Sequence, residues 1–64
     1  MPHQDNQPPR LPPEALEDLC RYLGEYGWEA KFAVRILHRR YGISISPLDA
    51  AYLYAVEMRR RAFS

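Results

Sequence analysis

Few side chains of this 64-residue sequence are suited to catalysis: one cysteine, Cys20, and two histidines, His3 and His38. Cys20 falls on the apolar arc of a predicted helix, where a thiol is a small hydrophobic group rather than a nucleophile. The neighbours of His38 on its helix are cations, whereas a catalytic imidazole is held by a carboxylate. A metal site needs three or four ligands at suitable spacing, and the three glycines stand at helix ends rather than in a phosphate-binding loop. We therefore expect no catalytic residue, no metal, no cofactor and no enzymatic activity.

Cations of the second predicted helix fall on one arc, because they are spaced at i, i+4, i+7 and i+8. We call this set the basic stripe: Lys31, Arg35, His38 and Arg39. Trp28 stands at its N-terminal end, and an exposed indole beside cations can stack on a base or anchor a protein contact. Arg59 and Arg60, near the C-terminus, add cations that also suit the end of a helix dipole. These residues predict an acidic-protein or phosphate site, or else a solvated surface.

Apolar residues of the third predicted helix exceed what one core face needs. We assign the core face to Leu48, Ala51, Tyr52, Ala55, Met58 and Ala62, with Val56 and Phe63 at one margin. Leu53 and Tyr54 then fall on the outward half, where a soluble monomer places polar groups. Together with Trp28 and Arg61, they are the predicted surface for a protein partner or for self-association.

Three helices are needed to hold these residues. The first predicted helix has Pro12 and Pro13 at its start. Its apolar residues form one stripe, made up of Leu16, Leu19, Cys20 and Leu23. Its charged residues fall on the opposite arc, made up of Glu14, Glu17, Asp18, Arg21 and Glu25. The second, 28–41, has an apolar arc of roughly 200°, wide enough to contact two helices: Ala30, Phe32, Ala33, Val34, Ile36, Leu37 and Tyr41. Gly42 ends it, and Ser46, Pro47 and Asp49 begin the third as N-cap, N1 and N3 residues.

The chain is long enough for one small core only. Residues 1–10 contain three of the six prolines and no apolar period, which indicates a disordered tail. We therefore predict an all-α protein, a small three-helix bundle at 11–64 that forms a single domain after this Pro-rich tail.

The segment 41–48, Tyr-Gly-Ile-Ser-Ile-Ser-Pro-Leu, is similar to the turn of a helix-turn-helix motif. The resemblance covers about a dozen residues and implies that the third helix enters the major groove of DNA. Its expected outward residues are Asp49, Ala50, Leu53 and Tyr54, which include no Arg, Lys, Asn or Gln to read bases. The same residues also form ordinary helix caps.

The distribution of charge along the chain and the length of its apolar runs bear on which classes of function we expect. Residues 1–29 have six acidic and two basic side chains, whereas 30–64 have two acidic and seven basic ones. The polar start lacks the regions of a secretory signal, and the longest apolar run, 50–56, is too short to span a bilayer. We expect a cytoplasmic, non-membrane protein that acts as a non-catalytic helical interaction module with a protein partner. Binding of nucleic acid, helix-turn-helix-like or non-specific, is the alternative.

Overall fold

The computed structural model describes residues 10–64, and all the regular secondary structure in this part of the chain is helical. Helix α1 (Pro13–Cys20) continues directly into one turn of π-helix, η1 (Arg21–Glu25), and is followed by α2 (Ala30–Tyr41) and α3 (Pro47–Ala62). The predicted all-α fold with three helices is confirmed. The predicted tail, apart from Arg10, lies outside the described residues.

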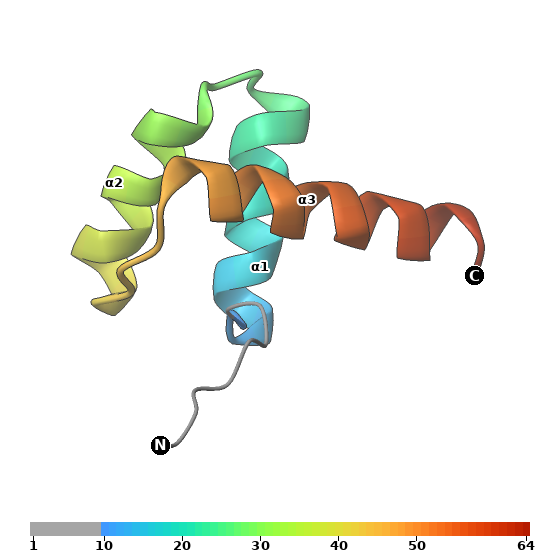
Figure 1. Ribbon diagram of the computed structural model, residues 1–64, viewed down its shortest axis with the longest axis horizontal. Coiled ribbons are helices and arrows are strands. Elements are labelled where there is room, and N and C mark those ends of the chain that lie inside the picture. Colours follow the sequence, from blue (N-terminus) through green and yellow to red (C-terminus); the bar gives the residue numbers. More distant parts are fainter. Residues whose placement is uncertain (1–9) are drawn as a thin grey trace, which may run out of the picture.

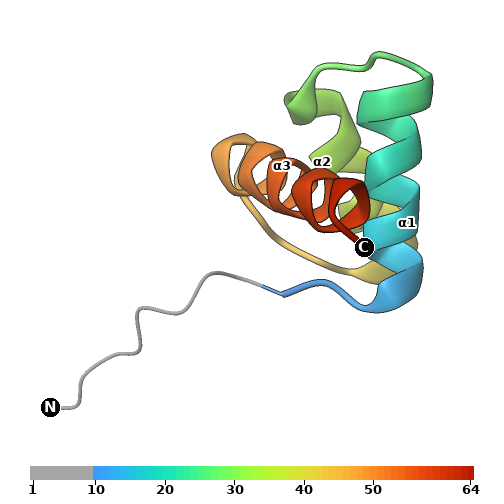
Figure 2. The same ribbon diagram turned by 90° about the vertical axis from the view of Figure 1, so that its right-hand side faces the viewer.

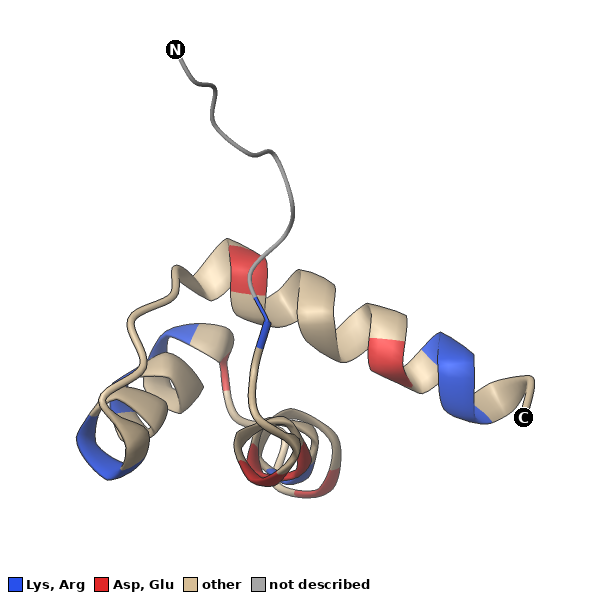
Figure 3. Ribbon diagram, turned by 90° about the horizontal axis from the view of Figure 1, so that it is seen from below, with Lys and Arg blue, Asp and Glu red and all other residues tan. Residues whose placement is uncertain are grey.

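Helix α3 lies across one side of α1 and α2, which are neighbours in space (Figures 1 and 2). Seen from below, the N-terminal half of α3 runs alongside α1 and α2, and its C-terminal half extends beyond α1 (Figure 3). None of the helices within 10–64 is both long enough and apolar enough to cross a membrane.

Two large side chains, Leu19 and Leu37, are completely buried at the centre of the fold. Each of the three α-helices also contributes one alanine with no exposed surface: Ala15 from α1, Ala33 from α2 and Ala50 from α3. These residues belong to one apolar cluster. Small side chains at the contacts allow the helices to approach closely, as close packing requires.

Helix ends follow the capping signals of the sequence. The hydroxyl of Ser46 accepts a hydrogen bond of 3.0 Å from the backbone N–H of Asp49, and Pro47 occupies the first turn of α3. Gly42 ends α2 with a left-handed φ of 71°, a conformation that costs glycine little, and its N–H donates to the carbonyl of His38.

The predicted faces of α3 are wrong, because the helix is turned with the opposite side inward. Leu53 and Tyr54, expected outward, are half-buried and pack against the apolar cluster. Leu48, Tyr52 and Val56, expected in or beside the core, are exposed by 79%, 52% and 44%.

The inward side of α3 buries Ala50 completely, and it also makes ion pairs. Arg61 on the inward side of α3 donates hydrogen bonds of 2.8 Å both to Glu17 of α1 and to Glu57, which is itself only 7% exposed. A helix with apolar residues on both sides has no strongly preferred face of its own, so packing against the other helices decides which side faces inward.

Two further expectations differ from the structure. Phe32, assigned to the apolar arc of α2, is 45% exposed, whereas Asp18, assigned to the polar arc of α1, is buried. The hydroxyl of Tyr41 donates a 2.5 Å hydrogen bond to the Asp18 carboxylate, and Arg40 lies 3.3 Å from it. Asp18 is buried because α2 supplies these polar partners.

Candidate functional site

An apolar hollow of about 350 Å³ opens on the outer surface of α2, and we call it the Trp28 hollow. It is lined by Trp28, Phe32, Arg35 and Ile36. Trp28 and Phe32 are exposed by 39% and 45%, so both rings can be reached from solvent. The hollow therefore combines two accessible rings with one cation.

Trp28 is held firmly although it is accessible. Its indole stacks on the buried ring of Tyr22 with centroids 4.7 Å apart and an angle of 17° between the planes, and Tyr26 packs beside it at 5.5 Å. The backbone N–H of Trp28 donates a 2.8 Å hydrogen bond to the carbonyl of Tyr22. Gly27, with φ of 71°, makes the turn that brings the chain back from η1. An aromatic side chain held in this way loses little entropy when it binds.

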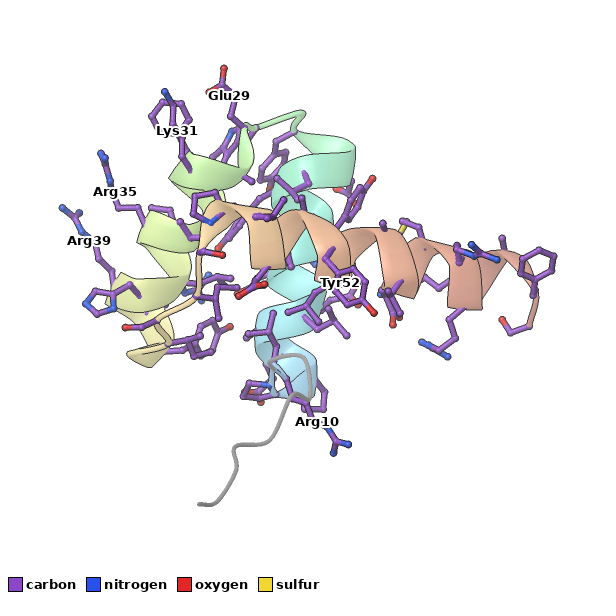
Figure 4. The ribbon with its side chains drawn as sticks, in the orientation of Figure 1. Arg10, Glu29, Lys31, Arg35, Arg39 and Tyr52 are labelled. Carbon is purple, nitrogen blue, oxygen red and sulfur yellow. The ribbon has the colours of Figure 1, made fainter. Side chains whose placement is uncertain are left out.

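The basic stripe is exposed along its whole length, as predicted. Lys31, Arg35 and Arg39 project away from the body of the protein along the outer edge of α2 (Figure 4). Lys31 lies 3.6 Å from the exposed carboxylate of Glu29. Within 10–64, neither Arg35 nor Arg39 forms an ion pair, so both are available to an external carboxylate or phosphate.

Cations and apolar surface are interleaved on this side of α2. The Lys31 ammonium and the Arg35 guanidinium lie 5.3 and 6.0 Å from the centre of the Phe32 ring, which are cation–π distances. Arg35 also borders a second hollow of about 410 Å³, whose apolar lining includes Val34 and Ile43. It therefore stands between two hollows.

Arginines at the end of α3 have a different role. Arg60 and Arg61 both donate hydrogen bonds to the Glu57 carboxylate, and Arg61 also binds Glu17. Arg61 was predicted to bind a protein partner, and Arg60 to bind an acidic partner or a phosphate. To do so, each would have to give up the ion pairs that it makes within the protein. Figure 3 places this cluster and the cations of α2 at opposite ends of the protein, so the structure does not bring them into one site.

Hydrogen bonds from Arg60 and Arg61 lower the pKa of Glu57 from its ordinary value of 4.5 to about 2. Because the folded protein has the lower pKa, the stabilisation from this carboxylate is complete above pH 4.5 and is lost as the pH falls toward 2. We expect the free energy of unfolding to decline across this window and to decline less steeply in Glu57→Gln. Denaturant titrations of both proteins at several pH values measure this, and equal slopes would contradict it.

Of the four residues predicted to bind a partner, Trp28 is exposed by 39%, Leu53 and Tyr54 are half-buried, and Arg61 is ion-paired. Phe32 was missed as a surface residue. The cations that flank it at positions −1 and +3 are the sequence signal that would have found it.

Within residues 10–64, Cys20 and His38 are the side chains suited to catalysis, and no hydrogen bond joins them. Burial raises the pKa of Cys20, so its thiol stays protonated at neutral pH. The imidazole of His38 lies 3.4 Å from the hydroxyl of Ser44, and His3 lies outside the described residues. Among residues 10–64, no three His, Cys, Asp or Glu side chains are grouped so that they could hold a metal ion.

The Trp28 hollow and the basic stripe are therefore the features from which a function can be argued. Their chemistry is that of a surface that binds an apolar group next to negative charge. Comparison with known proteins finds no family model that matches this chain, and no curated protein or solved structure with significant similarity to it.

Proposed function

We propose that this chain is a non-catalytic protein-binding module and that its α2 surface binds an acidic segment of a partner protein. The observation that supports this is the Trp28 hollow, with two accessible aromatic rings, beside Arg35 and Arg39, which have no carboxylate partner within residues 10–64. Tryptophan, other aromatic residues and arginine are the residue types that contribute most to protein–protein affinity.

The geometry suggests how each part contributes. A large apolar side chain of the partner enters the Trp28 hollow and contacts Trp28 and Phe32, which removes apolar surface from water. Acidic side chains next to it pair with Arg35 and Arg39. Because Arg35 lies at the rim of the hollow, its guanidinium can meet a carboxylate close to the buried apolar contact, where water screens the pair less.

Nucleic-acid binding is the second candidate, since the same cations could contact phosphates while Trp28 stacks on a base. The outward side of α3 argues against sequence-specific reading of DNA. Leu48, Tyr52 and Val56 are exposed there, and Asp49 is the charged residue of the first turn. A helix that reads bases in the major groove presents hydrogen-bond donors such as Arg, Asn and Gln.

Selection from a displayed library of short random peptides tests the proposal. We expect the enriched peptides to contain a large apolar residue flanked by Asp or Glu. Affinity for these peptides should fall about tenfold or more in Arg35→Glu and in Phe32→Ala. The matched control is Arg10→Glu, which makes the same change in net charge away from α2 (Figure 4) and should leave affinity unchanged.

Enriched peptides without acidic residues, or equal losses in Arg35→Glu and Arg10→Glu, would contradict the proposal. A labelled single-stranded oligonucleotide tests the second candidate. Strong binding that falls steeply with salt, and that disappears when Lys31, Arg35 and Arg39 are changed to Ala, would favour nucleic acid instead.

A further inference from the structure

We propose that the exposed side of α3 binds the same side of a second copy of this chain, with the two α3 helices antiparallel. We call this side the α3 outer face and define it by Leu48, Tyr52, Val56, Arg59 and Phe63. It is separate from the Trp28 hollow, so the proposal does not depend on the proposed function.

The first argument is the amount of apolar surface left uncovered. Leu48, Tyr52, Val56 and Phe63 are exposed by 79%, 52%, 44% and 81%. Leu48, Tyr52 and Val56 fall on one side at the helical period, and Phe63 follows directly after the 16-residue helix. A hollow of about 690 Å³ lies along the second half of this face, lined in part by Tyr52, Val56 and Phe63. Contiguous apolar surface of this kind is unusual in a monomer and marks an interface.

The second argument is charge, and it selects a second copy as the occupant. Asp49 lies in the first turn of α3, and Arg59 lies in its last turn. A twofold axis across the middle of the helix places Asp49 of each copy near Arg59 of the other. Parallel helices would instead bring the two Arg59 side chains together. The antiparallel arrangement also brings opposite ends of the helix dipoles into contact.

The third argument is access. Among the described residues, the C-terminal half of α3 extends beyond α1, which leaves its outer side open to a second copy (Figures 1 and 3). Arg10 and Leu11 border the face along one edge, where they share a hollow with Tyr52 and Val56. Ala51 and Ala55, also exposed, permit close approach of the two helix axes. Such a contact is symmetric and closed, as in most soluble dimers.

Sedimentation velocity of the full chain from micromolar to millimolar concentration tests the proposal. We expect the mass to rise with concentration from that of a monomer to twice that value. Val56→Glu should stay monomeric where the unmodified chain is dimeric, while circular dichroism still shows a folded helical protein, because Val56 is exposed. The matched control is Phe32→Glu, a similarly exposed position on α2, which should dimerise normally.

A charge exchange tests the antiparallel orientation. Asp49→Arg and Arg59→Asp should each weaken the dimer about tenfold or more, because each brings like charges together, and the double variant should recover affinity. If Val56→Glu fails to fold, the charge-exchange variants of Asp49 and Arg59 still test whether the α3 outer face forms the dimer. A chain that is monomeric at every concentration, a dimer lost in Phe32→Glu but not in Val56→Glu, or a double variant no tighter than either single one would overturn the proposal.

Discussion

Leu37→Ala is expected to lower the free energy of unfolding by about 2–5 kcal/mol, a large part of the stability of a small domain. Leu37 has no exposed surface and lies in the central apolar cluster. Its truncation removes apolar contacts and leaves a cavity that three packed helices cannot fully close. Unfolding in urea, followed by circular dichroism, measures the loss.

Phe32→Ala is the matched control for Leu37→Ala, since both remove a large apolar side chain from α2. Phe32 is 45% exposed, so we expect a loss below about 1 kcal/mol. If the two variants unfolded at the same urea concentration, the description of the inward and outward sides of α2 would be wrong.

The second large effect is expected for Asp18→Ala, which should cost about 1–3 kcal/mol. Asp18 accepts the hydrogen bond from Tyr41 and faces Arg40, and its own surface is 8% exposed. Removing the carboxylate leaves the hydroxyl of Tyr41 without this partner in a half-buried position. Asp18→Asn keeps an acceptor oxygen and should lose less.

A double-mutant cycle with Tyr41→Phe isolates this contact. Once Asp18 is Ala, replacing Tyr41 by Phe should cost little more, because the hydrogen bond is already absent. Chemical unfolding of the four proteins gives the coupling free energy. Strictly additive losses would show that the carboxylate and the hydroxyl do not stabilise one another.

The local features of the fold were predictable from sequence because their causes lie within a few residues. Ser46 and Gly42 mark helix ends through contacts within one turn. Leu37 lies at the centre of an apolar arc, so its burial followed from helical periodicity.

Features that depend on contacts between helices were not predictable in this way. Which side of α3 faces inward depends on how Ala50, Leu53 and Tyr54 pack against the apolar cluster formed with the other helices. Burial of Asp18 depends on Tyr41, which is 23 positions away. A helical wheel contains no information about partners on other helices, so it assigned Leu53, Tyr54 and Asp18 to the wrong sides.

The candidate site could be predicted from the sequence only in part. The basic stripe was identified because its exposure follows from spacing along one helix, and Trp28, which precedes α2, was identified because it stands next to these cations in the sequence. The accessible ring of Phe32 was not identified, because Phe32 was assigned to the apolar arc of α2 although Lys31 and Arg35 flank it in the sequence.

The three buried alanines, one from each α-helix, have a consequence for how the sequence can vary. A larger side chain at Ala15, Ala33 or Ala50 has no free surface to turn toward, and it would push apart helices that the other two alanines hold close. These three alanine positions are therefore the ones where replacement by a larger side chain is least tolerated. In a library that samples every amino acid at these three positions, folded members should contain almost only Ala, Gly or Ser there, while positions on the α3 outer face accept many residues.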